Sequence, residues 1–453
     1  MDVEMLVLTT PPSDFAAAME EARDSWKGRI AADPEAVCAE VREVTLDLES
    51  YLPRWNLSRP GASGAWSADQ VRAAAAANYG LLRSLGRAAE ADDVAAEARA
   101  LARSNLLKLT RAHDEGIVNC LWGNDYASGL KDAMRRGAIV CTTNPQLVNI
   151  ARKEAPDYWT AVRDGLRERY SNPEELAKVM TMEVVIKNAR LLRPVCKATD
   201  GAMGYVSFQL NPKNAGDADA MIADAEEIFG WVRERFTDGD PNVVFKVPGT
   251  YAGIAVAEAL TGQGIGINVT VNYTVPQQLA FGAAIEKGSA RFSYLTNMDG
   301  RLDDPIAEEL GEGKADSAEK ASTWAGIAVA KKAHRLLHTR LGYRKSILLD
   351  ASGRGPWHIL RSLPGPGEHP IHKTVFPNKQ EEFDGLAEVD IRPSLSDEIP
   401  TDVLARLYRS VQFRQAYEVN GLAPLEFDDF PAAVDTLTTF SAQYDEFVAW
   451  CAG

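Results

Sequence analysis

Short β-branched runs separated by helical segments dominate the chain from about residue 116 onward. Runs of this kind stand at 117–121, 138–142, 203–210, 242–247, 264–271, 290–296, 345–350 and 372–376. This alternation is typical of βα units that build a parallel sheet. Eight such units predict an α/β protein with a (β/α)8 barrel rather than an open doubly wound sheet, and no GxGxxG sequence follows the first run. In such barrels the chemistry lies at the C-terminal ends of the strands.

Helical spacing flanks the predicted barrel on both sides, because apolar residues recur three and four positions apart before residue 113 and after residue 395. We therefore predict an N-terminal helical extension at 1–112, a catalytic barrel at 113–395 and a C-terminal helical segment at 396–453 that packs on the barrel. The extension could cap the barrel mouth or form the interface of a homodimer. The sequence leaves both open.

Composition excludes several classes of protein. The 453 residues carry a net charge of -15, which argues against a nucleic-acid partner because that affinity comes from lysines and arginines. No apolar stretch approaches the roughly 20 residues that span a bilayer. The first residues are acidic where a secretory signal would be basic, and the five cysteines show no CxxC spacing. We expect a cytoplasmic protein with reduced cysteines and no membrane partner.

Lys246 interrupts the apolar run NVVFKVPGT at 242–250, where a strand buried on both faces would normally carry valine or isoleucine. Burial disfavours its ammonium form. The lysine therefore either pairs with a carboxylate, projects from the strand end, or loses its proton and becomes a nucleophile that forms Schiff bases with carbonyl substrates. A structural ion pair is the plainer interpretation of a single lysine.

Polar residues accumulate at the ends of the predicted strands. Each has an ordinary explanation, since Asn and Thr cap helices and Ser-Gly-Arg can form a turn. Their convergence on one end of a barrel predicts a polar site. These residues are Asn144, Gln209, Lys246, Asn268, Thr270, Ser352 and Arg354.

Several strand motifs resemble, in order, those of transaldolases. They are CTTNPQL at 141–147, VSFQLNP at 206–212, VVFKVPGT at 243–250 and GIGINVTVNYTVPQQLAFGAAIEKG at 264–288. The resemblance continues through LLDASGRGPWHI at 348–359, TVFPN at 374–378 and the tail at 421–440. It covers about residues 116–445 and leaves out the N-terminal helical region.

The resemblance implies that Lys246 attacks the C2 carbonyl of a ketose phosphate. Retro-aldol cleavage then leaves a dihydroxyacetone unit bound as an enamine, which is transferred to an aldose phosphate. The protonated imine withdraws electrons from the breaking C3–C4 bond, and the amine must be unprotonated before it attacks. The expected partners are thus phosphorylated sugars of the pentose phosphate pathway or of other carbohydrate metabolism. No cofactor and no metal are expected, although His334 and His338 lie four residues apart as a helix-surface pair.

Further site roles follow from the same resemblance. Asn144 matches the asparagine of the TTNP motif, while Asn268 and Thr270 match an NxT sequence whose amide holds substrate hydroxyls and whose threonine positions a catalytic water. Ser352 and Arg354 match the SxR sequence that binds the substrate phosphate, which suits the planar fork of an arginine.

Two positions depart from the usual transaldolase pattern. Most members have glutamate where Gln209 stands, and an amide cannot exchange protons. Glutamine there is similar to the fructose-6-phosphate aldolase subgroup. On the first strand, Trp122 aligns with the family aspartate in LWGND at 121–125. Either Asp125 takes over as the catalytic carboxylate or the proton shuttle runs differently, and Asp114 and Asp132 are poorer candidates.

The second phosphate-binding arginine of the family corresponds to Arg301 if a few residues are inserted, with Ser293 as the preceding serine. The leading hypothesis is a transaldolase-like transferase. A class I aldolase that releases dihydroxyacetone is the enzymatic alternative, because of Gln209. A non-catalytic barrel that binds sugar phosphates is the other alternative, because of Trp122 and Gln209 together.

Overall fold

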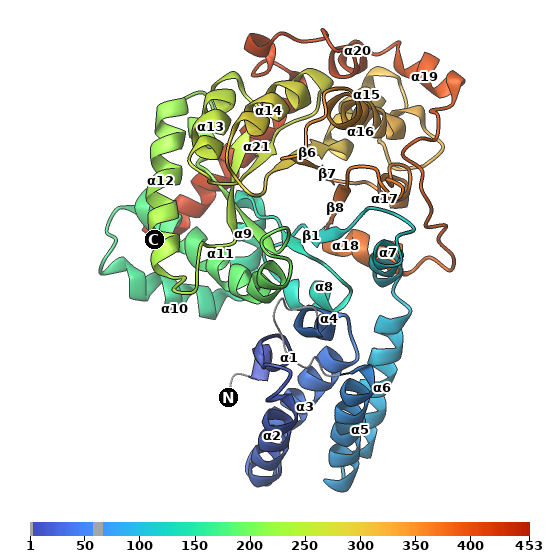
Figure 1. Cartoon of the computed structure of the whole chain (residues 1–453). Helices are drawn as coiled ribbons and strands as arrows, with labels where there is room; N and C mark the ends of the chain where they lie inside the picture. The colour runs from blue at the N-terminus through green and yellow to red at the C-terminus, as the bar shows by residue number, and fades with distance from the viewer. Residues whose placement is uncertain (1–2, 58–66) are drawn as a thin grey trace.

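Eight parallel strands close into a barrel in the computed structural model, which describes residues 3–57 and 67–453 (Figure 1). The strands follow chain order around the barrel, and β1 pairs with β8 to close it. They are β1 (Trp122–Asn124), β2 (Val140–Cys141), β3 (Tyr205–Gln209), β4 (Val243–Pro248), β5 (Ile267–Thr270), β6 (Tyr294–Met298), β7 (Ile347–Ala351) and β8 (Ile371–Val375). The predicted (β/α)8 barrel is confirmed.

Seven predicted strands overlap observed ones, but the first prediction, 117–121, is wrong because β1 begins at Trp122. Val118, Cys120 and Leu121 are buried, yet their segment lies before the point where β1 pairs with β8. An apolar run indicates that a segment is buried, and here the buried segment stands before the strand in the chain. The shift moves the C-terminal end of the first strand onto Asn124.

Helices follow the strands and cover the outside of the barrel (Figure 1). Several begin with a polar cap directly after a strand, and Thr250 and Thr274 each accept a backbone N–H at 3.1 Å. The helices between β1 and the C-terminal segment are α8 (Leu130–Arg135), α9 (Pro145–Glu154), α10 (Pro156–Arg167), α11 (Pro173–Ala198), α12 (Ala218–Glu234), α13 (Tyr251–Gly262), α14 (Val275–Lys287), α15 (Asp299–Glu309), α16 (Ala325–His334), α17 (Pro356–Leu360) and α18 (Pro377–Asp384).

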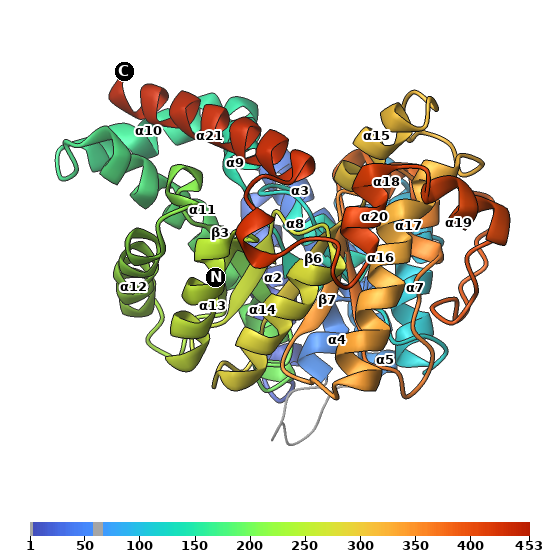
Figure 2. The same cartoon turned by 90° about the horizontal axis from the view of Figure 1, so that it is seen from above.

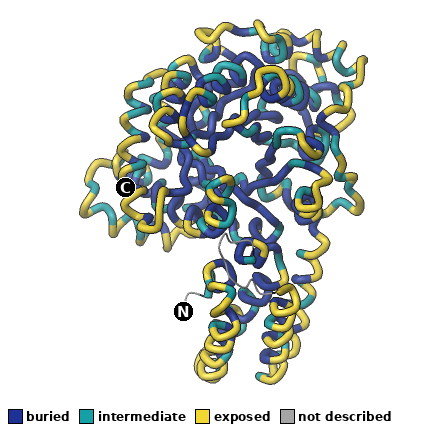
Figure 3. Tube along the Cα trace, viewed as in Figure 1, coloured by how far each residue is buried: buried dark blue, intermediate teal, exposed yellow. Residues whose placement is uncertain are grey.

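The N-terminal helices pack on one side of the barrel, and α2, α3, α5 and α6 extend away from it with largely exposed far ends (Figures 1 and 3). A buried ion cluster ties them to the barrel, because Asp47 of α3 accepts from Arg135 Nε of α8 at 2.8 Å. They are α1 (Leu6–Thr9), α2 (Phe15–Arg29), α3 (Pro34–Leu48), α4 (Leu52–Leu57), α5 (Ala68–Ser84), α6 (Ala88–Ala102) and α7 (Asn105–Asp114), the last of which packs against α18.

The C-terminal segment contains α19 (Thr401–Leu407), α20 (Val411–Tyr417) and α21 (Pro431–Ala452). Helix α21 is long and lies across α9 and α11, close to the end of the barrel where the strands finish (Figure 2). Within the described ranges, no helix is long and apolar enough to cross a bilayer.

Candidate active site

Lys246 lies toward the C-terminal end of β4 and lines a cavity of about 260 Å³ at the barrel mouth. It stands in register between Gln209 on β3 and Asn268 on β5, and it is 6% exposed. Residues from seven further segments share the cavity, and none of the residues described before position 115 does. Its polar lining includes Asp125, Thr142, Asn144, Thr270, Thr296, Arg301, Ser352, Arg354 and Lys379.

The environment of Lys246 favours its neutral form. Burial lowers the pKa of its ammonium, and Arg301 lowers it further, while Asp125 and Cys141 oppose the shift only in part. Within residues 3–57 and 67–453, no carboxylate forms an ion pair with Lys246. The structure therefore does not support the plainer interpretation of this lysine as a partner in a buried ion pair.

A second buried lysine shows what such a structural pair looks like in the same barrel. Lys373 on β8 forms an ion pair with Asp350 on β7 and donates to Ser362. Burial alone would lower the pKa of Lys373, but Asp350, together with Cys120 and Asp299, outweighs it and the pKa is raised. Lys373 stays charged, whereas Lys246 is set up to lose its proton.

Asp125 follows β1 directly and reaches the cavity of Lys246. Its backbone N–H donates to Val375 O at 3.2 Å, and its Oδ1 accepts the hydroxyl hydrogen of Thr142 at 2.6 Å. Trp122 is fully buried, and its indole N–H donates to Thr110 Oγ1 at 3.2 Å on helix α7, away from the cavity. Asp125, and not the residue at position 122, is the carboxylate that the first strand brings to the site.

Asn268 and Thr270 stand two residues apart on β5, the strand next to Lys246, and therefore share one face of that strand. Thr296 on β6 donates to Asn268 Oδ1 at 2.5 Å, and Asn268 Nδ2 is buried without a hydrogen-bond partner in the described chain. Buried amide donors are normally satisfied. This free donor lies on the strand beside Lys246, and Thr270, two residues further along β5, lines the cavity.

Two arginines supply positive charge at the β6 and β7 side of the cavity. Arg301 in α15 donates to Thr436 Oγ1 at 3.3 Å, and its guanidinium lies 5.5 Å from the ring centre of Phe440. Arg354 pairs with Asp304 at 2.6 Å and donates to Ser352 O at 2.8 Å. Two guanidinium groups on one wall can hold a phosphate dianion.

The backbone around Ser352 is strained and tightly packed. Ser352 has φ 59°, in the left-handed region that L-residues other than Asn and Asp rarely adopt. A Cβ added at Gly300 would lie 2.2 Å from Ser352 O, so only glycine allows α15 to approach this loop. Val271, directly after β5, also has a positive φ of 54°. Such strain persists where the surrounding structure imposes it, as at ligand sites.

Comparison with known proteins agrees with this geometry. The Transaldolase/Fructose-6-phosphate aldolase family profile matches residues 129–398, more than half of the chain. The chain belongs to this family. Asp125 and α21 lie outside the matched residues, so their place at the cavity of Lys246 comes from the structure.

The chain is similar to several curated transaldolases. Transaldolase 1 of Streptomyces avermitilis is 29% identical over 244 residues, which are 50% of this chain and 62% of that protein. Transaldolase 2 of the same organism is 30% identical, over 53% of this chain and 68% of the relative. A transaldolase of Arthrobacter sp. strain FB24 is 22% identical over 74% of this chain and 89% of its own length. The chain thus spans a little under two thirds of the first of these relatives.

One predicted residue of the transaldolase site lies elsewhere. Ser293 precedes β6, and its Oγ accepts from Ile267 N at 3.3 Å at the opposite end of the strands. It is buried and does not line the cavity. Thr296 lies three residues further on and does line it, a position that sequence reasoning missed because the sixth strand was placed too early. Counting back five residues from Arg301 would have found this hydroxyl.

Two further predicted residues lie at the edge of the site. Asn144 lines the cavity, and its Oδ1 also caps α9 by accepting Leu147 N–H at 2.9 Å. Gln209 is next to Lys246 in register but lines an adjoining pocket, where its Oε1 has no partner among the described residues. The structure thus brings seven of the ten predicted residues to one cavity, and it places Asn268 and Gln209 at the strand positions on either side of Lys246.

The histidines show no arrangement for a metal in the described part of the chain, where no group of three or more His, Cys, Asp or Glu could hold one. The predicted surface position of His334 and His338 is wrong, because both are buried. Each ring bonds a backbone carbonyl, of His369 at 2.8 Å and of Tyr343 at 2.9 Å respectively.

Proposed function

We propose that this transaldolase family member transfers a dihydroxyacetone unit from a ketose phosphate to an aldose phosphate through a Schiff base on Lys246. The observation that carries the proposal is a buried, unpaired lysine at a barrel strand end, in a cavity that also holds a carboxylate and two arginines. A neutral amine in such a pocket is nucleophilic toward carbonyl carbon.

The neighbouring groups have the chemistry that each step requires. Lys246 Nζ bonds to C2 of the ketose, and water leaves as the imine forms. When the C3–C4 bond breaks, its electron pair enters the imine to give an enamine, and Asp125 accepts the proton of the C4 hydroxyl. Arg301, Ser352 and Arg354 hold the phosphate, while Asn268, Thr270 and Asn144 bind hydroxyls or water.

Borohydride trapping with fructose 6-phosphate, followed by peptide mapping, tests the proposal. We expect one reduced three-carbon or six-carbon adduct on the peptide that contains Lys246. Lys246→Ala should give no adduct. Lys379→Ala is the matched control, because Lys379 lines the same cavity but is paired with Glu382 at 2.6 Å, and this variant should trap normally. Trapping that survives in Lys246→Ala would overturn the assignment.

A second candidate, release of free dihydroxyacetone, is favoured by Gln209. This neutral amide stands beside Lys246 in register, where a proton-exchanging carboxylate would serve transfer. Measuring cleavage of fructose 6-phosphate with and without erythrose 4-phosphate separates the two activities. Turnover that requires the acceptor supports transfer, and equal turnover without it supports the aldolase. The non-catalytic alternative requires that no adduct forms at all.

We also propose a cytoplasmic location, supported by five cysteines that are all free in the structure. Self-association as a homodimer would use the exposed N-terminal helices, since they do not contribute to the cavity. Light scattering after size-exclusion chromatography of the full chain distinguishes monomer from dimer.

A further inference from the structure

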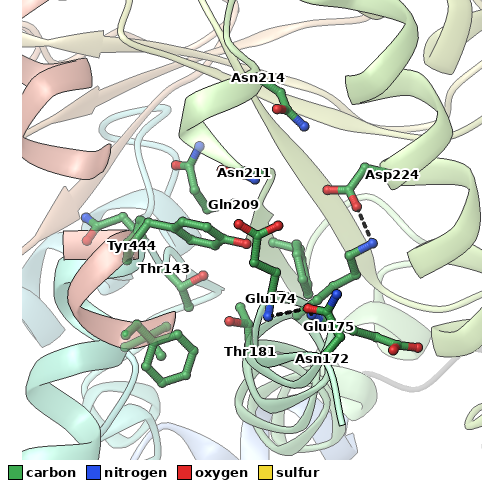
Figure 4. A pocket seen from close by; sticks show the side chains of 16 residues that line it. Thr143, Asn172, Glu174, Glu175, Thr181, Gln209, Asn211, Asn214, Asp224 and Tyr444 are labelled. Carbon is green, nitrogen blue, oxygen red and sulfur yellow. Dashed lines mark hydrogen bonds and ion pairs between the residues drawn. The ribbon is translucent and has the colours of Figure 1, made fainter. Parts of the chain in front are cut away.

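Arg301 and Arg354 form the basic wall of the active-site cavity, on its β6 and β7 side. The adjoining pocket of about 300 Å³, into which Tyr444 of α21 projects, offers a phosphate no alternative (Figure 4). Among the residues that the structure describes, its lining contains no arginine, and its one lysine, Lys178, is paired with Asp224 at 2.6 Å. Binding of a phosphate therefore depends on how the two arginines are held relative to each other.

The backbone of Arg354 is held by a histidine. Its N–H donates to Nδ1 of His358 in α17 at 3.0 Å. The loop packs closely on this side chain, because a Cβ added at Gly353 would lie 3.2 Å from His358 Cβ. Ser352, at the start of the loop, has a positive φ, and a backbone of this kind keeps its shape only where its surroundings impose it. His358 supplies one of the contacts that do so.

The ring of His358 is in turn fixed by a buried carboxylate. His358 Nε2 lies 2.8 Å from Asp303 Oδ2 of α15. Because a backbone N–H can only donate, Nδ1 of His358 carries no proton, and Nε2 donates to the carboxylate. Asp303 Oδ1 accepts Gly326 N–H at 2.9 Å, so both oxygens of this carboxylate have a donor. Asp303 thus sets the tautomer and the orientation of the ring.

Asp303 and His358 act behind the site and not in it. Neither lines the active-site cavity, and their side chains are 0% and 3% exposed. A buried carboxylate is costly, and apolar side chains would join α15 to α17 at a lower cost. Directional hydrogen bonds provide what apolar packing does not, a single fixed orientation of the group that they hold. Here that group is the backbone of Arg354.

Helix α15 connects the two arginines. Asp303 stands two residues after Arg301, so the two side chains leave the helix on different faces. Arg301 reaches the cavity, whereas Asp303 faces His358. Asp304, the next residue, pairs with the guanidinium of Arg354 at 2.6 Å. One helix thus carries the first arginine and holds both the backbone and the side chain of the second.

We propose that Asp303 and His358 are positioning residues for phosphate recognition. Asp303 orients the ring of His358, and Nδ1 of that ring fixes the backbone of Arg354 at the spacing from Arg301 that one phosphate requires. The inference rests on the proposed function, because it treats the two arginines as the phosphate site.

Glucitol 6-phosphate tests the assignment without chemistry, because this polyol phosphate has no carbonyl and cannot form a Schiff base. Its Kd is measured by isothermal titration calorimetry on the full chain. His358→Asn keeps an acceptor at the place of Nδ1, whereas His358→Gln puts its amide at the place of Nε2 and leaves the N–H of Arg354 without a partner. We expect Kd to rise about tenfold in His358→Gln and less than about threefold in His358→Asn.

His338→Gln is the matched control. Its ring is equally buried at 3% exposure, bonds a backbone carbonyl at 2.9 Å and lies outside the cavity, so Kd should not change. In an Arg354→Gln background, His358→Gln should change Kd by less than about twofold, because it acts through that residue. The proposal is overturned by an unchanged Kd in His358→Gln, by equal losses in His358→Asn and His358→Gln, by a loss in His338→Gln, or by a tenfold loss that persists in the Arg354→Gln background.

Kinetics show whether the effect belongs to the phosphate. His358→Gln should raise KM for fructose 6-phosphate about tenfold and leave kcat unchanged. KM for unphosphorylated fructose should stay the same, and an equal rise for both substrates would show a general structural role instead.

The binding experiment also separates this inference from the proposed function. If borohydride trapping fails while binding of glucitol 6-phosphate depends on His358 as expected, the covalent step is wrong and the positioning role stands. If the wild-type protein does not bind glucitol 6-phosphate, the positioning role is wrong, whatever the trapping shows.

Discussion

Thr296 donates its hydroxyl hydrogen to Asn268 Oδ1 across 2.5 Å, between the neighbouring strands β6 and β5. The bond occupies the amide oxygen of Asn268 and so fixes the orientation of that side chain. It leaves Asn268 Nδ2 as a buried donor without a partner in the described chain, on the strand beside Lys246. Thr296, which also lines the cavity, therefore fixes the orientation of the Asn268 amide.

Thr296→Val tests this relationship. The substitution keeps the shape of the side chain but removes the donor, so the amide is free to turn. We expect kcat/KM for fructose 6-phosphate to fall roughly 5- to 30-fold, the value of one buried hydrogen bond. Thr438→Val is the control, because that exposed hydroxyl bonds only Val434 O of its own helix. Unchanged kcat/KM in Thr296→Val would count against the role.

Lys246→Met should make the protein more stable at neutral pH. The pKa of Lys246 is lowered on folding, so the unfolded chain binds more protons, and the destabilisation is largest below the folded pKa. The advantage of the methionine variant should shrink as pH rises toward the ordinary lysine value of 10.5. Urea unfolding at several pH values measures this. The exposed Lys314→Met should show no such trend, and a Lys246→Met protein that is less stable at neutral pH would refute the idea.

Arg301→Gln should weaken recognition of the phosphate. Loss of a charged donor costs roughly 1.5–3 kcal/mol, so KM for fructose 6-phosphate should rise about 10- to 100-fold. KM for unphosphorylated fructose should stay the same, because that substrate offers no dianion. Arg72→Gln, at an arginine that is 71% exposed and remote from the cavity, is the control. An equal rise in KM for both substrates would place Arg301 in a general structural role.

Asp47→Ala should weaken the attachment of the N-terminal helices to the barrel. Asp47 is 1% exposed and pairs with Arg135 at 2.7 Å and Lys131 at 2.8 Å. Its removal leaves Arg135 with only the more exposed Glu43 and Asp132 as partners, so the free energy of unfolding should fall by about 1.5–3 kcal/mol. Asp24→Ala, at an ion pair that is exposed on both sides, should cost less than about 1 kcal/mol. Similar losses in the two variants would contradict the cluster's role.

The barrel could be predicted from the sequence because its buried strands appear as apolar runs at regular intervals. Parallel strands covered on both faces read as apolar β-branched runs, and seven of the eight runs overlap observed strands. Lys246 and its neighbours could be found for the same reason, since a polar residue that interrupts such a run is conspicuous. The strand ends were less certain. Alignment with the family pattern put Trp122 at the place of the aspartate and Ser293 at the place of a site serine, whereas the structure brings Asp125 and Thr296 to the cavity.

The amino-acid sequence by itself determined the closed α/β architecture, the family and the residue that carries the amine. Only the tertiary structure decided that Asp125 and Thr296 line the cavity of Lys246 while Ser293 does not, and that α21 brings Phe440 and Tyr444 over two adjoining spaces. The physical reason is one of range. The pattern of buried residues within one strand or helix can be read from a short stretch of sequence. A site is formed by side chains that are far apart in sequence, and their contact depends on strand register and helix packing.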